Sequence, residues 1–213
     1  DGASAQYGSD AIAGVINIIT KKSVNQVSGS LGLSAYYDPK FNTAFESSLH
    51  KDYEHAGKFD GKAFNGNINF GLPLGKKGGF INLTFDGTKT GKTFRQALKT
   101  DNYQQDDEAM YLNIYRRGHG DAELEAFGTF VNLELPFTPK TSFYAFGGSN
   151  TKNSDAFAFT RNWSARPDRF PTNANGDLIV VPGIMKTASD GDIWYSPHIQ
   201  TEIKDFAATG GLK

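Results

Sequence analysis

The sequence contains no cysteine, two methionines and two tryptophans, and no long apolar run. Without cysteine, disulfides, thiolate zinc sites and thiol nucleophiles are excluded. The longest mostly apolar stretch covers residues 11–19, whereas a transmembrane helix needs about 20 apolar residues. A net charge of −1 gives none of the basic excess expected of a nucleic-acid-binding surface. We therefore expect no nucleic-acid partner.

The sequence also lacks the residue patterns of an enzyme. It has no nucleophile elbow and no glycine-rich phosphate loop, and no pair of carboxylates has a spacing that supports acid–base chemistry. No serine has an identifiable base partner. We expect no catalytic residue, no cofactor and no metal centre.

Glycine and aromatic residues are abundant, with 24 Gly, 17 Phe and 9 Tyr, a composition that favours strands and turns over helices. Apolar and polar residues alternate along four segments, and period 2 over about ten residues predicts strands with one apolar and one polar face. On the fourth, Phe130 is an exception on the polar side. The four segments are residues 27–37, 63–72, 80–86 and 125–137.

Two further segments predict weaker strands. Residues 141–150 are apolar on both sides near their start, which leaves the orientation of this strand open. Residues 205–213 place Phe206, Ala208 and Leu212 on one face. The sequence thus predicts about six strands.

The connections between these strands alternate strictly between long and short. They cover residues 38–62, 73–79, 89–121, 138–140 and 151–203. Loops beyond about 12–15 residues are uncommon in compact soluble domains. Short turns at one end and long loops at the other are typical of an antiparallel transmembrane β-barrel of the outer-membrane type. A soluble β-sandwich with the same alternation is the alternative.

The opening stretch, residues 1–22, does not share this alternation. Gly2 and Gly8 permit a tight turn, and Ser9 or Asp10 can cap a short helical turn. Residues 15–19 then have the pattern of a buried strand, in which Asn17 is the polar member. We therefore expect two parts, the end of a small globular domain at 1–22 and a β-barrel region at 23–213.

The segment YGSDAIAGVINIITKK, residues 7–22, resembles the end of the plug domain in TonB-dependent outer-membrane receptors. It differs from the family pattern at Ala13, where glycine is usual. A looser likeness to a large receptor subgroup covers residues 144–162. The residues that carry the first resemblance are Tyr7, Gly8, Ser9, Asp10, Gly14, Val15 and Asn17.

This resemblance implies an all-β fold in which about six strands belong to a 22-stranded barrel preceded by the end of a plug. Barrels of that width have a plugged lumen. The family imports scarce solutes (ferric siderophores, haem, cobalamin or oligosaccharides) across the bacterial outer membrane. The implied partners are outer-membrane lipid, a small-molecule ligand and the TonB complex, which contacts a segment near the N-terminus of these receptors.

On this interpretation the chain is part of a longer receptor. Six strands in an open sheet have unpaired edges that lipid cannot satisfy, so we expect that the chain alone neither inserts stably nor transports. Two other hypotheses remain, a passive porin or anchoring barrel and a soluble β-rich binding module. Glu123 and Glu125 share the outward face of Phe127, so the barrel hypothesis requires both to lie near the loops, above the hydrocarbon.

The third long connection holds arginines among aromatic residues, a combination suited to an anionic, partly aromatic ligand such as a ferric siderophore. The candidate ligand-binding residues are Arg161, Trp163, Arg166 and Arg169. Aspartates of the same segment cancel any net positive field, so ordinary loop packing is the alternative. These aspartates are Asp155, Asp168, Asp177, Asp190 and Asp192.

Two polar clusters in the other long connections have metal-ligand chemistry but unsuitable spacing. The first holds His50, Asp52, Glu54 and His55, and its two histidines fall on different faces of either a helix or a strand. The second holds Asp106, Asp107 and Glu108, which match no EF-hand. We expect both to be solvated loops.

Overall fold

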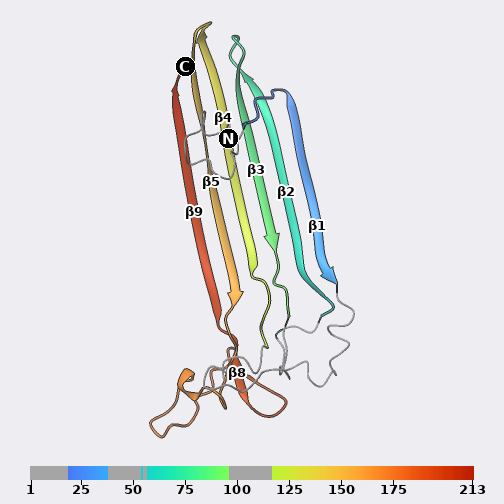
Figure 1. Ribbon diagram of the computed structural model, residues 1–213, viewed down its shortest axis with the longest axis vertical. Coiled ribbons are helices and arrows are strands. Elements are labelled where there is room, and N and C mark those ends of the chain that lie inside the picture. Colours follow the sequence, from blue (N-terminus) through green and yellow to red (C-terminus); the bar gives the residue numbers. More distant parts are fainter. Residues whose placement is uncertain (1–18, 38–53, 55–56, 96–116) are drawn as a thin grey trace, which may run out of the picture.

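The protein forms an open six-stranded antiparallel sheet with a small three-stranded sheet near one end (Figure 1). A computed structural model describes residues 19–37, 54, 57–95 and 117–213. The strand order of the large sheet follows the sequence, β1-β2-β3-β4-β5-β9. Its strands are β1 (Gln26–Tyr37), β2 (Phe59–Leu74), β3 (Gly79–Thr90), β4 (Glu123–Thr138), β5 (Thr141–Phe157) and β9 (His198–Leu212).

All six predicted strands are confirmed, and several extend further than the alternation indicated. β5 continues to Phe157 and β9 starts at His198. The loop-end half of β5 is mostly polar on both faces, and that of β9 alternates in the opposite sense to its other half, with Ile199 and Ile203 on the face of Lys152. The short connections lie at one end of the sheet, here called the turn end, and the long ones at the opposite loop end (Figure 1). In the described part of the chain β1 and β9 do not pair, so no closed barrel is formed.

The cross-strand register places most apolar residues of the six strands on one face, the apolar face. One row across this face joins Val27, Phe70, Leu83, Val131 and, at its far end, Ala208. Within the described residues no layer covers the side chains of this face: Val27 is 73% exposed, and Phe206 is 80% exposed. The register also settles β5, where Phe143 and Ala145 lie on the apolar face and Tyr144 and Phe146 on the other.

The opposite, polar face carries mainly Asn, Ser, Thr and Asp. One row runs across the sheet in strand order, namely Ser30, Asn67, Asp86, Gly128, Asn150 and Asp205. Phe130 lies on this face between Thr84 and Gly148, as the sequence predicted. The sheet is thus strongly two-sided.

Glu123 and Glu125 lie at the loop end of β4, beyond its apolar residues. Glu123 is the first residue of the strand and pairs with Asp155, and Glu125 pairs with Lys89. The placement near the loops that the barrel hypothesis required is therefore present.

The long connection between β5 and β9 contains the second sheet, whose order is β6-β8-β7. Its strands are β6 (Arg161–Asn162), β7 (Lys186–Thr187) and β8 (Ile193–Tyr195), and a 3₁₀ helix covers Pro167–Arg169. The buried hydrophobic residues of the described chain are Phe80, Phe170, Ala188 and Trp194, three of which belong to this segment. None of the helices in the described residues has the length and apolarity to span a membrane.

Candidate functional site

The segment that precedes β1, residues 19–25, crosses the polar face near the turn end and is here called the strap. In Figure 1 it is the dark blue coil that passes from β1 toward β3. The backbone N–H of Asn25 donates to the carbonyl oxygen of Gly71 on β2 at 2.8 Å. From there the strap continues across β3 to β4, where the following contacts hold it.

Three asparagines on the polar face, here called the asparagine row, bind the strap or support its binding. Asn82 on β3 donates to the carbonyl oxygen of Ser23 at 3.0 Å. Asn132 on β4 donates to the carbonyl oxygen of Lys21 and to the hydroxyl of Thr20, both at 2.9 Å. Asparagine suits this role because its short amide offers donors and an acceptor at once.

Asn69, on β2, completes the row without touching the strap. Its side-chain amide donates to Asn82 Oδ1 at 2.6 Å and to Thr84 Oγ1 at 2.8 Å, which orients the Asn82 amide toward Ser23. Asn69 and Asn82 are each 2% exposed and Asn132 is 8% exposed. Buried amides of this kind are costly to leave unpaired, so the row and the strap stabilise each other.

A glycine makes the close approach of the strap possible. A Cβ added at Gly71 would lie 1.7 Å from the carbonyl oxygen of Ser23, so any side chain there would push the strap off the sheet. Farther along, Lys22 Nζ lies 3.9 Å from Glu134 Oε2 on the same face. Sequence reasoning missed the strap because its contacts join residues far apart in the chain.

The strap overlaps the last four residues, 19–22, of the segment that carries the plug resemblance. The predicted plug-end residues (Tyr7, Gly8, Ser9, Asp10, Gly14, Val15 and Asn17) lie outside the described residues. From Thr20 onward the described chain lies on the polar face, where Thr20 and Lys21 bind Asn132.

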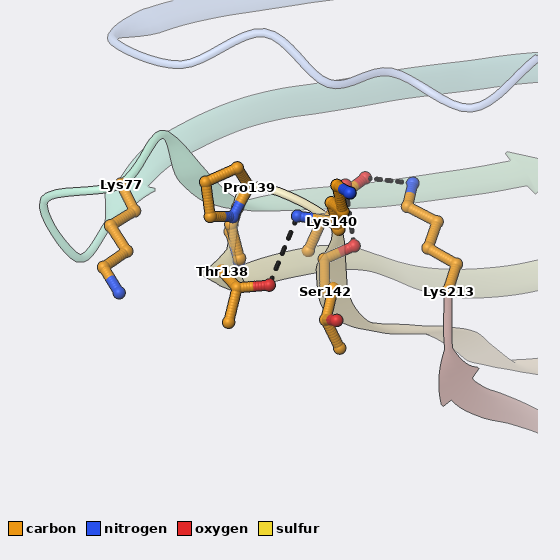
Figure 2. A pocket seen from close by; sticks show the side chains of 9 residues that line it. Lys77, Thr138, Pro139, Lys140, Ser142 and Lys213 are labelled. Atoms are coloured by element: carbon orange, nitrogen blue, oxygen red, sulfur yellow. Dashed lines mark hydrogen bonds and ion pairs between the residues drawn. The ribbon is translucent and has the colours of Figure 1, made fainter.

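A hollow of about 650 Å³ opens at the turn end, lined by residues of the two short hairpins and the end of β9 (Figure 2). Lys77, Lys140 and Lys213 contribute cationic side chains. Glu134 accepts hydrogen bonds from Lys213 at 2.8 Å and from the Ser142 hydroxyl at 3.3 Å. The rim of the hollow is therefore cationic, and its carboxylate, Glu134, is already paired with Lys213.

The four candidate ligand-binding residues at the loop end mainly contact other residues of their own connection. Arg166 binds Asp168 through two hydrogen bonds of 2.9 Å, and Arg169 Nε lies 3.0 Å from the same carboxylate. The hydrogen bond from Arg166 lowers the pKa of Asp168. The structure thus brings Arg166 and Arg169 together, but around the carboxylate of Asp168.

The other two candidates lie in the second sheet and its flank. Trp163 packs edge-on against Phe170 at a centroid distance of 5.6 Å. Arg161 pairs with Tyr195 across β6 and β8, and its Nη1 atom is buried without a hydrogen-bond partner. Both arrangements are compatible with loop packing.

A second cluster at the loop end, here called the loop junction, joins all three long connections. Trp194 is fully buried, with the Arg117 guanidinium 5.3 Å from its ring centroid and Lys186 Nζ at 5.0 Å. Glu54 forms an ion pair with Lys186 at 2.6 Å, and its N–H donates to the carbonyl oxygen of Arg117 at 3.0 Å. Residues of the three connections thus meet at one tryptophan, which no sequence spacing indicated.

Of the first polar cluster, expected to be a solvated loop, the structure describes only Glu54, which is paired with Lys186. His50, Asp52, His55, Asp106, Asp107 and Glu108 lie outside the described residues. Within the described ranges no three potential ligand side chains gather around a metal-sized site.

No family model, no curated protein and no solved structure matches this chain. The function must therefore be argued from the geometry of the sheet, the strap and the loop junction, together with the resemblance of residues 7–22.

Proposed function

We propose that this chain forms the end of a plug domain and six wall strands of a bacterial outer-membrane receptor for energy-coupled uptake of a scarce solute. The observation that carries the proposal is the strap, which attaches the plug-like segment to the polar face of a sheet whose other face is apolar and uncovered. In a barrel the polar face lines the lumen, so the attached domain sits inside.

The apolar face supports a lipid-facing placement. A transmembrane strand needs about 9–11 residues to cross the hydrocarbon, and on β4 the stretch from Phe127 to Phe137 has that length. On β5 the corresponding stretch runs from Phe143 to Thr151 and leaves Asp155 outside. Because lipid satisfies no backbone hydrogen bonds, the free edges of β1 and β9 require further strands, in keeping with the larger barrel that the resemblance implies.

The loop end supports a role in docking. Trp194, Arg117, Glu54 and Lys186 hold the three long connections together, and a surface fixed in advance loses less entropy when a ligand binds. The solute classes remain those of the family, namely ferric siderophores, haem, cobalamin or oligosaccharides. Energy enters through TonB, which acts on a part of the receptor upstream of these residues.

Uptake assays test this proposal. Cells that make the whole gene product, and cells from which the gene is deleted, are grown with ferric siderophore, haem, cobalamin or maltodextrin as the sole source of the limiting nutrient. The expected result is loss of growth on one of these in the deletion strain. Growth should also be lost when TonB is removed or the proton gradient is collapsed.

Two results would contradict the proposal. Entry of small hydrophilic solutes that depends on the gene but not on TonB would indicate a passive porin. Recovery of the protein in the periplasmic or cytoplasmic fraction, with none in the outer membrane, would indicate a soluble module.

A further inference from the structure

The turn end of the large sheet carries an excess of positive charge. Between the row of Asp86 and Asp205 and the turns, the described chain has a single side-chain carboxylate, that of Glu134. The same region holds six lysines, namely Lys21, Lys22, Lys76, Lys77, Lys140 and Lys213. Toward the loops, three ion pairs balance strand lysines with carboxylates, namely Lys89–Glu125, Lys92–Asp155 and Lys204–Glu202.

Two of the six lysines stand in the hairpin turns that form the rim of the hollow of about 650 Å³ (Figure 2). Lys77 and Lys140 are both exposed. Lys77 Nζ donates to the neutral carbonyl of Phe137, and the Lys140 ammonium group forms no ion pair within the described residues. Glu134 is bonded to Lys213 at 2.8 Å. The charges of Lys77 and Lys140 are therefore not neutralised by this carboxylate.

The apolar face of the sheet ends directly beside these two lysines. Phe137 and Phe143 flank the turn between β4 and β5 on that face, and Phe137 is 46% exposed. Lys140 lies between them in the sequence, and Lys77 is bonded to the backbone of Phe137. If the apolar face lies in hydrocarbon, as proposed above, a lysine at its boundary lies at the level of the phospholipid headgroups.

We propose that Lys77 and Lys140 bind the phosphate of an anionic phospholipid in the leaflet at the turn end. The acyl chains lie on the apolar face beside Phe137 and Phe143, and the headgroup lies at the rim of the hollow. The Thr138 hydroxyl accepts from the Lys140 N–H at 3.2 Å, which leaves its own proton for a phosphate oxygen. The inference rests on the proposed function and deepens it by naming a lipid partner for the turn end.

A phospholipid fits this place better than a soluble anion does. Each lysine near an anionic membrane surface strengthens binding about fivefold, and a phospholipid adds contact between its chains and the apolar face. A soluble anion would meet only exposed charges, which salt screens. The direct succession of apolar face and unneutralised lysines is what favours the lipid.

Lipid retention by the full gene product tests the inference. The protein is reconstituted in vesicles of phosphatidylglycerol mixed with phosphatidylcholine and extracted in a mild detergent, and the lipids that remain bound are counted by native mass spectrometry. The variant Lys77→Gln/Lys140→Gln removes both ammonium groups. The matched control, Lys58→Gln/Lys152→Gln, removes the same charge from two exposed lysines toward the loops.

Amine labelling of the wild type gives a second measurement that needs no substitution. The labelling rates of Lys77 and Lys140, each relative to Lys152 of the same chain, are compared in vesicles of phosphatidylglycerol and of phosphatidylcholine. A further sample in phosphatidylcholine receives inorganic pyrophosphate as a soluble anion.

We expect the wild type to retain phosphatidylglycerol in preference to phosphatidylcholine, and Lys77→Gln/Lys140→Gln to lower this preference at least about fivefold. The control should keep it, and phosphatidylglycerol should slow labelling of Lys77 and Lys140. Equal preferences in the two double variants would overturn the inference. Protection by pyrophosphate without a preference for phosphatidylglycerol would also overturn it, in favour of a soluble anion.

The uptake assay described above separates this inference from the proposed function. A preference for phosphatidylglycerol that depends on Lys77 and Lys140, in a protein without energy-coupled uptake, would reject the receptor and retain the lipid contact. Energy-coupled uptake without that preference would reject the lipid contact alone.

Discussion

Asn82 donates its side-chain amide to the carbonyl oxygen of Ser23, a residue 59 positions earlier in the chain. Asn82 also accepts from Asn69, so one buried amide joins two strands to the segment before the first strand. Together with the contacts of Asn132 to Thr20 and Lys21, this contact holds the strap on the polar face of the sheet.

Replacing Asn82 with leucine should loosen the strap. The substitution removes the donor to the Ser23 carbonyl oxygen and leaves that carbonyl unpaired, at a cost of about 1–3 kcal/mol. If the strap opens locally, cleavage by trypsin after Lys21 or Lys22 should accelerate by about five- to a hundredfold. Asn67→Ala is the control, because Asn67 bonds to Ser30 on the same face without contact to the strap. Equal cleavage rates in the two variants would show that Asn82 does not hold the strap.

Gly71→Ala should displace the strap by steric overlap, since its Cβ would lie 1.7 Å from the Ser23 carbonyl oxygen. Hydrogen exchange at the Asn25 amide, which donates to Gly71, should rise. Gly66→Ala on the same strand is the matched control, with no neighbour closer than 3.4 Å to the added atom. The idea fails if Gly71→Ala leaves exchange at Asn25 unchanged while the protein remains folded.

The strands and their facing could be predicted from the sequence because period 2 is a local signal. In β1, β2 and β3 each apolar residue has a polar neighbour, so every position reports its side. The half of β5 near the loops carries charged and amide residues on both faces, and in β9 Ile199 and Ile203 reverse the alternation of the rest of the strand. Their extension beyond residue 150 and before residue 205 is fixed by pairing between them, which no local pattern contains.

The strap and the loop junction could not be predicted for a related reason. Asn69, Asn82 and Asn132 each fit a polar strand position, and only the register brings Asn82 opposite Asn132 and places Asn69 in the next row beside them. Trp194 is packed by Arg117, and Glu54 pairs with the neighbouring Lys186, so the junction depends on residues of two other connections. The composition of the third connection suggested that its arginines bind a ligand. Asp168, however, is close enough in sequence to pair with both Arg166 and Arg169.

The two tryptophans offer a direct measurement of the loop junction. In a Trp163→Phe variant the emission comes from Trp194, which is fully buried, so we expect blue-shifted fluorescence that acrylamide quenches weakly. In Trp194→Phe the emission comes from the half-exposed Trp163 and should be quenched more strongly. Trp194→Ala should cost about 3–5 kcal/mol of stability in this region. Equal quenching of the two single-tryptophan variants would contradict the buried junction.

Acid should weaken the loop end of the large sheet through Asp155, which lies outside the proposed spanning stretch of β5. Burial raises its pKa, but hydrogen bonds from Gln200, Lys92 and His198 outweigh burial and lower the pKa to about 2. The ordinary value is 3.8, so the stabilisation is complete above about pH 4 and is lost as the pH falls toward 2.

Thermal unfolding of the wild type and of Asp155→Asn measures this effect. The difference in Tm between them should be largest above pH 4 and should shrink between pH 4 and pH 2. Glu202→Gln serves as the comparison, since that carboxylate pairs with the exposed Lys204 of its own strand. A difference in Tm for Asp155→Asn that stays constant over this range would reject the assignment.

Charged substitutions on the apolar face test the lipid-facing placement itself. Val131→Lys introduces a charge in the middle of the apolar row on β4, where a lysine at the bilayer midplane costs about 2–4 kcal/mol. Asn153→Lys introduces the same charge on the same face, but beside Glu125 and Glu202 at the loop end, where the cost falls to about 0–1 kcal/mol. Urea unfolding of the full gene product in phospholipid vesicles should therefore separate the two variants by at least about 1 kcal/mol. If both cost the same, the apolar face does not lie in lipid, and the receptor proposal loses its membrane orientation even though the strap contact would stand.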